Sequence, residues 1–112
     1  MKNYYLGFSI LFILLGLVHI ACTPIFYKSY SLDAVWFAGT GFGVALVGLI
    51  NISAIKTDIK VISYYAVISN ILCFILFIII FSFIKLEVQS VAGFVLILAL
   101  TVFSFISLRE KN

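Results

Sequence analysis

Apolar residues fill four long stretches of the chain, and short polar segments separate these stretches. The four stretches cover residues 4–23, 32–55, 59–84 and 90–108. Each is long enough to cross a bilayer as a helix, which takes roughly 20 apolar residues. The third stretch contains no charged residue between Lys60 and Lys85. The pattern therefore predicts four membrane-spanning helices within one domain, residues 1–112.

The connections between the apolar stretches are short, so consecutive helices must lie antiparallel and side by side. We expect the first helix to stop at Pro24, which has no N–H to donate and clashes with the preceding turn. Ser31 is suited to cap the second helix, with Asp33 in its first turn. Gln89 or Ser90 lies near the start of the fourth helix. The predicted fold class is all-α, an up-down antiparallel four-helix transmembrane bundle.

Composition indicates that lipid surrounds the helices. Hydrophobic residues make up 65% of the chain and charged residues 10%, whereas soluble domains are about 45–50% apolar and about 25% charged. A domain of 112 residues cannot bury that much apolar surface, so the expected partner is the lipid bilayer. The basic residues are scattered at the ends of the apolar runs, which argues against nucleic acid as a partner.

Lysines and arginines are divided unequally between the two ends of the predicted bundle. Five of the seven lie at the end that holds both termini: Lys2, Lys56, Lys60, Arg109 and Lys111. Because cytoplasmic loops are enriched in these residues, we expect both termini to face the cytoplasm. The compact size and the residue usage favour a bacterial inner (cytoplasmic) membrane protein.

The first apolar stretch also has features of a cleavable signal peptide. It follows Lys2, and it ends in Ala21-Cys22, which is similar to a lipoprotein cleavage site. However, His19 stands where that site requires leucine or a similar residue. The stretch is also longer than the roughly 7–15 residues of a signal-peptide core. We therefore expect it to be retained as a helix.

Several polar and aromatic residues gather at the outer end of the predicted bundle. Helical rise places His19 level with Trp36 on the second helix, while Asp33 and Tyr27 lie slightly further out. We take these four residues as candidate ligand-binding positions, because ionisable groups within membrane spans are functional candidates by default. A His19–Asp33 pair could transfer a proton or hold a polar head group. Alternatively, His19 bonds Asp33 or a loop carbonyl and only fixes the first connection.

Two asparagines lie within the spans, where an amide that faces lipid is costly. Asn70 is close to the middle of the membrane, so it is expected to face inward. Asn51 and Asn70 are interpreted as groups that hydrogen-bond between helices. Asn70 could alternatively line a ligand cavity. Cys22 and Cys73 are too far apart along their helices to form a disulfide.

Glycines are concentrated in the second helix and mark its expected packing faces. Gly39 and Gly43 are four residues apart, as are Gly41 and Ala45. This spacing places bare backbone on a helix face, where another helix can approach closely. We expect Gly39, Gly41 and Gly43 to pack against the first and third helices. The alternatives are a homodimer face, or the floor of a site for a flat lipid or quinone.

These features favour a non-catalytic membrane protein that binds a lipid-like ligand or a membrane partner subunit. A small transporter of the multidrug-resistance type would need a carboxylate inside the first helix, which has none. An enzyme at the membrane surface would depend on His19 and Asp33, with Tyr27 beside them, and no catalytic residue is assigned. One histidine and no ligand cluster give no reason to expect a metal site, a haem or another cofactor.

A weak pattern also connects the chain to a known group. The segment Gly16-x-x-His19, followed by Pro24 and by a second helix with Asp33, Trp36 and glycines, resembles small bacterial four-span families of the DoxX-like kind. The resemblance covers about the first 55 residues. Some DoxX-like proteins are described as accessory subunits of membrane oxidoreductases. The resemblance therefore implies such a role as an alternative, with His19 as the position of interest.

Overall fold

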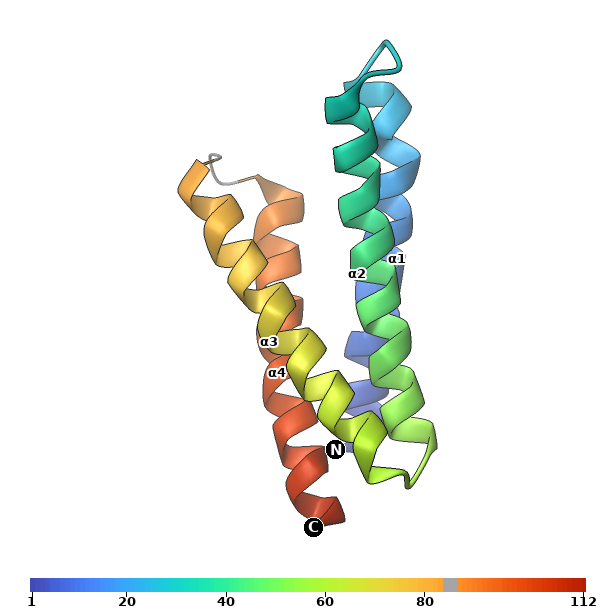
Figure 1. Cartoon of the computed structure of the whole chain (residues 1–112), viewed down its shortest axis with the longest axis vertical. Coiled ribbons are helices and arrows are strands. Elements are labelled where there is room, and N and C mark those ends of the chain that lie inside the picture. Colours follow the sequence, from blue (N-terminus) through green and yellow to red (C-terminus); the bar gives the residue numbers. More distant parts are fainter. Residues whose placement is uncertain (84–86) are drawn as a thin grey trace.

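The computed structural model describes residues 1–83 and 87–112, and these residues form a bundle of α-helices. The helices are α1 (Lys2–Phe26), α2 (Leu32–Lys56), α3 (Lys60–Phe83) and α4 (Val88–Lys111). They run alternately up and down, so both termini lie at the same end of the molecule (Figure 1). The predicted all-α four-helix fold is confirmed. The predicted end of the third span, residue 84, lies outside the described residues.

We call the end that holds both termini and the α2–α3 connection the terminal end. The opposite end, with the α1–α2 connection and the start of α4, is the loop end. Figure 1 shows two antiparallel helix pairs, α1 with α2 and α3 with α4, which meet near the terminal end and diverge toward the loop end. The molecule is therefore built from two helix hairpins that lie further apart at the loop end than at the terminal end.

Glycines set the close approach of α1 and α2. A Cβ atom at Gly16 would lie 2.5 Å from the carbonyl oxygen of Gly41 and 2.8 Å from the backbone nitrogen of Ala45. A Cβ atom at Gly41 would likewise lie 2.7 Å from the carbonyl oxygen of Gly16, and one at Gly48 would lie 3.0 Å from that of Ser9. Gly41 therefore packs against α1, together with Gly16 and Gly48, which were not among the predicted packing residues.

The same role is wrong for Gly39 and Gly43 within the chain. Both are exposed, and a Cβ atom at either position would meet nothing within 4 Å. Gly39 lies two residues from Gly41, which is about 200° around a helix with 3.6 residues per turn. Helix α2 therefore presents one glycine face to α1 and a second glycine face to the outside.

A buried polar network joins all four helices toward the terminal end. The Tyr5 hydroxyl donates to Oδ1 of Asn51 (2.6 Å), and Nδ2 of Asn51 donates to Oδ1 of Asn70 (2.8 Å). Nδ2 of Asn70 donates to Oδ1 of Asn51, to the carbonyl oxygen of Leu100 and to Oγ of Ser104. Asn70 therefore faces inward, as predicted, and Asn51 joins helices, as predicted. The part of Tyr5 was not foreseen.

Lys111 closes the terminal end of the bundle. Its Nζ atom donates to the carbonyl oxygens of Ala54 and Thr57 and to Oγ of Ser63, at 2.6–2.9 Å. The two carbonyls belong to the end of α2, where a positive charge is favourable because it faces the negative end of the helix dipole. The last turn of α4 is thus fastened to both helices of the α2–α3 corner.

The helix ends differ from the predictions in two places. Helix α1 continues through Pro24 to Phe26, because a proline in the last turn removes only one backbone hydrogen bond. Helix α4 begins at Val88, two residues before the start of the predicted span 90–108, and Gln89 and Ser90 lie near its start, as expected. The predicted cap of α2 is confirmed, since the Ser31 side chain accepts a hydrogen bond from the Ala34 backbone N–H at 3.2 Å.

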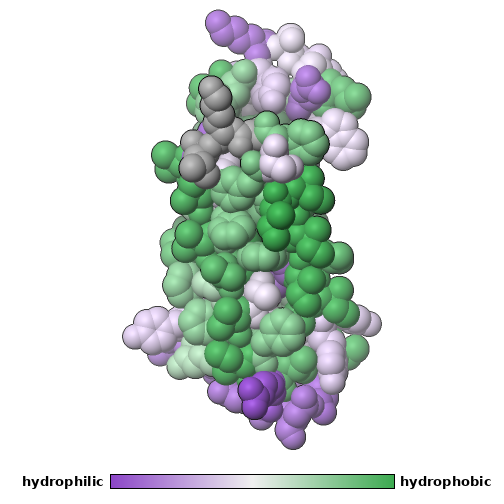
Figure 2. Space-filling model, turned by 90° about the vertical axis from the view of Figure 1, so that its left-hand side faces the viewer, coloured by the Kyte–Doolittle hydropathy of each residue, from purple (hydrophilic) through white to green (hydrophobic). Residues whose placement is uncertain are grey.

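The outer surface of the bundle is apolar along most of its length. Figure 2 shows a broad hydrophobic band between hydrophilic groups at the two ends. All four helices have the length and composition to cross a membrane. The molecule is 48 Å long, close to the roughly 40–45 Å of a bilayer with its head groups. The protein is therefore a membrane protein, and the apolar side chains along the middle of the bundle face lipid.

Candidate functional site

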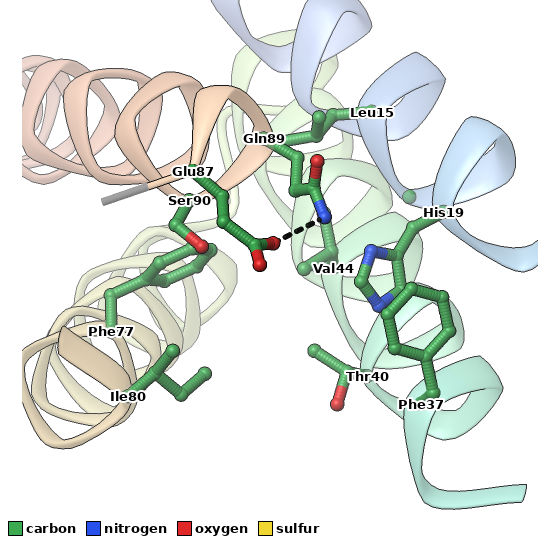
Figure 3. Close-up of a pocket in the computed structure, with 11 residues that line it drawn as sticks. Leu15, His19, Phe37, Thr40, Val44, Phe77, Ile80, Glu87, Gln89 and Ser90 are labelled. Carbon is green, nitrogen blue, oxygen red and sulfur yellow. Dashed lines mark hydrogen bonds between the residues drawn. The ribbon is translucent and has the colours of Figure 1, made fainter. Parts of the chain in front are cut away.

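A cavity of about 160 Å³ lies between the two hairpins at the loop end. Its apolar wall is formed by side chains from α1, α2 and α3, and its polar groups come from α1, α2 and α4 (Figure 3). The lining comprises Leu15, Gly16, His19, Phe37, Thr40, Val44, Phe77, Ile80, Glu87, Gln89 and Ser90. The divergence of the hairpins therefore leaves a small space with one polar side.

The start of α4 provides a carboxylate at this cavity. Glu87 is the N-cap residue of α4, but its side chain makes no capping hydrogen bond with the helix. Instead, Figure 3 shows the carboxylate pointing into the space between the hairpins. Nε2 of Gln89 donates to Oε2 of Glu87 at 2.9 Å and so orients the carboxylate. Because Glu87 is an exposed residue that also lines the cavity, it lies at the rim.

His19 forms the opposite side of the polar lining. Its imidazole stacks on the Phe37 ring, with centroids 3.8 Å apart and an angle of 21° between the planes. Stacking fixes the orientation of the ring, and Nε2 of His19 is buried without a hydrogen-bond partner among the described residues. A buried polar atom without a partner is costly. The protein itself covers this atom, so His19 lines the cavity with other atoms of its side chain.

The structure brings only part of the predicted outer cluster together. Tyr27 lies near His19, since both rings pack against Phe37, the tyrosine at a centroid distance of 5.3 Å. Asp33 is exposed, and no hydrogen bond or ion pair joins it to His19 in the described part of the chain. Trp36 is 69% exposed. It is one residue, about 100° of helix rotation, away from Phe37, so it faces the outside of the bundle.

Trp36 instead lies on a groove between α2 and α3. This groove has a volume of about 530 Å³, and Gly39 and Gly43 leave it open because neither has a side chain. Thr40 and Val44 line both the groove and the cavity. The groove and the cavity are therefore neighbours that share two residues of α2.

Asn70, the remaining candidate ligand-binding residue, lines neither space. Its Oδ1 atom and its Nδ2 atom both take part in the buried network. The structure thus supports the interpretation of Asn70 as a helix-joining residue. Cys73 lies along the groove, and Cys22 and Cys73 are both free cysteines, as expected from their separation.

Apart from His19, the polar residues of the cavity were not predicted as site residues from the sequence. Glu87 and Gln89 belong to the third connection of the sequence, outside the predicted spans. A signal was nevertheless present, because the up-down topology places that connection at the same end as His19. Thr40 and Ser90 are small hydroxyl residues of a kind that usually bonds the helix backbone, and nothing in their spacing marks them as cavity residues.

Comparisons with known proteins do not add to this description. No family model matches the chain, and neither the curated proteins nor the solved structures give a match. In the described residues, no group of three or more histidine, cysteine, aspartate or glutamate side chains is placed to hold a metal ion.

Proposed function

We propose that this protein is a membrane-embedded binding protein that holds a single-chain amphiphile at its loop end. The polar end of the ligand occupies the cavity between the hairpins, and its apolar chain lies in the groove between α2 and α3. The observation that supports this proposal most strongly is the arrangement of the two spaces. A small cavity with polar groups adjoins an apolar groove, and the two share Thr40 and Val44.

The volumes suit these two parts of a ligand. An engineered protein cavity of about 150 Å³ binds benzene, so a cavity of about 160 Å³ has room for a small head group. The groove, of about 530 Å³, is larger and faces the side of the bundle. An alkyl chain there would contact apolar side chains such as Leu72 and Leu76. Ligands commonly bind in such apolar sites with a few oriented polar groups.

The remaining features of the proposal follow from the charges of the chain. Both termini are proposed to face the cytoplasm of a bacterial cell, because the terminal end holds most of the lysines and arginines. The loop end, with the binding site, would then lie at the outer side of the inner membrane.

The DoxX-like resemblance suggests an accessory role beside a membrane enzyme. The absence of a His19–Asp33 contact gives no support to a catalytic role.

Trp36 offers a direct test, since it is the single tryptophan of the chain and lies on the groove. We expect a dodecyl alcohol brominated at the end of its chain to quench Trp36 fluorescence in lipid nanodiscs, with saturation near one molecule per chain. Gly43→Leu should weaken this binding at least about tenfold, because a leucine side chain fills the groove. The tenfold change corresponds to about 1.4 kcal/mol, and it reflects lost packing contacts between the chain and the groove, because lipid tails are as apolar as the groove.

Gly7→Leu is the matched control, because Gly7 is also an exposed helix glycine with open space around it but lies outside the groove. It should leave the quenching curve unchanged. Quenching that rises linearly without saturation, and equally in all three proteins, would show that the probe only partitions into the bilayer. That result would contradict the proposed function.

A further inference from the structure

The polar groups of the cavity also indicate the class of ligand, provided that the proposed function holds. We propose that the bound amphiphile is a single-chain amine, and that Glu87 binds its ammonium group. The carboxylate of Glu87 points into the space between the hairpins (Figure 3). It is the one formally charged side chain in the described lining. The charge complementary to this site is therefore positive.

Gln89 prepares the carboxylate for such a ligand. Its amide holds Oε2 of Glu87, while Oε1 has no hydrogen-bond partner among the residues described. An oxygen atom of a carboxylate forms stronger hydrogen bonds with a charged donor than with a neutral one. The cavity thus presents an oriented anionic acceptor with one oxygen that the described residues leave without a partner.

A primary ammonium group has three N–H donors, and the Thr40 hydroxyl is a second acceptor in the lining beside Glu87. His19 contributes its imidazole ring to the lining, but its Nε2 atom is covered by the protein. The Thr40 hydroxyl donates to the carbonyl oxygen of Trp36 at 3.1 Å, which leaves its lone pairs free to accept. Glu87, His19 and Thr40 all line the same cavity, and they belong to three different helices or helix ends.

The lining argues against a phosphate-containing head group. No lysine or arginine occurs among the cavity residues that the structure describes, and a phosphate would place a second negative charge close to Glu87. Like charges in proximity are unfavourable for binding. A free alkyl amine therefore fits the site better than a single-chain phospholipid that has an ethanolamine group, although both contain an ammonium.

The test compares three brominated single-chain probes by quenching of Trp36 fluorescence: a dodecyl amine, a dodecyl alcohol and a lysophospholipid with an ethanolamine head group. We expect the amine to bind at least about tenfold more tightly than the alcohol, because its hydrogen bond to Glu87 is charge-assisted. Glu87→Gln should reduce the affinity for the amine to that for the alcohol and leave the alcohol unchanged. The lysophospholipid should bind more weakly than the amine.

Glu110→Gln is the matched control, because it removes the same charge from an exposed residue at the opposite end of α4. It should leave all three affinities unchanged. Glu87→Gln removes no cap hydrogen bond from α4, and the loss of one exposed negative charge at the helix N-terminus should lower its melting temperature only slightly.

Saturable binding of amine and alcohol with equal affinity, or an equal effect of Glu87→Gln on both, would overturn the amine assignment and leave the proposed function intact. Tightest binding of the lysophospholipid would overturn the choice of a free amine. Failure of every probe to saturate would contradict the proposed function itself.

Discussion

Replacing Gly16 by leucine is expected to separate α1 from α2 and to prevent isolation of a folded protein. Even an alanine at this position would place its Cβ atom 2.5 Å from the carbonyl oxygen of Gly41 and 2.8 Å from the nitrogen of Ala45. Both atoms belong to the backbone, so no side-chain rotation relieves the clash. We expect Gly16→Ala to cost about 1–3 kcal/mol, the usual range for overpacking. Unfolding of the detergent-solubilised protein, followed by circular dichroism, measures the loss.

Gly39→Ala is the control for this experiment. It makes the same chemical change in the interior of a helix, but its Cβ atom would meet nothing within 4 Å. Its stability should equal or slightly exceed that of the wild type, because alanine favours the helical state by up to about 1 kcal/mol relative to glycine. Gly16→Ala tests the contact between α1 and the face of α2 that holds Gly41. An equal loss for Gly39→Ala would show that the second glycine face of α2 is packed as well, contrary to the structure.

Replacing Asn70 by leucine is expected to destabilise the bundle by about 1–3 kcal/mol, the cost of leaving buried polar partners without hydrogen bonds. The substitution keeps the approximate size of the side chain. It removes the partners of Asn51, of the Leu100 carbonyl and of the Ser104 hydroxyl. Tyr5→Phe removes a single bond from the same network and should cost less, about 0.6 kcal/mol.

Ser53→Ala serves as the reference for the loss of an exposed hydrogen bond. The Ser53 hydroxyl bonds only the Leu49 carbonyl of its own helix, so the change should be close to neutral. Equilibrium unfolding in mixed micelles gives the three values in one series. A neutral Asn70→Leu variant would mean that the network does not hold the hairpins together at the terminal end.

The membrane fold could be predicted from the sequence because the solvent imposes a simple rule. Backbone polar groups must be satisfied inside the hydrocarbon region, so four long apolar runs become four helices. The same rule predicted that Asn70 faces inward, since an amide has no partner in lipid. Helix ends were less certain, because one missing bond at Pro24 is easily tolerated in a last turn.

Glycine spacing showed that α2 packs closely but not on which side. Gly39 with Gly43, and Gly41 with Ala45, have the same separation and lie on different faces of the helix. Only the partner glycine on α1, Gly16, decides between them, and its contact with Gly41 requires knowledge of how the two helices are rotated.

The candidate site could be predicted at the level of one residue and one end of the bundle. His19 is the sole histidine of the chain, and its depth follows from helical rise. The expected pairing with Asp33 failed because Asp33 lies a full helical turn beyond Phe37, on which His19 stacks. Glu87 was overlooked because its distance from His19 depends on the angle between the hairpins, which no local pattern of residues determines.

Photolabelling of the protein in lipid nanodiscs tests the location of the ligand most directly. The probe is a dodecyl amine with a diazirine at the end of its chain, and the labelled residues are identified by mass spectrometry of peptides. We expect labels on groove residues such as Leu72 and Leu76, and their loss in the presence of excess unlabelled amine. Labels spread over lipid-facing residues of the other helices, such as Leu14 and Val95, and unaffected by excess amine, would contradict binding between the hairpins.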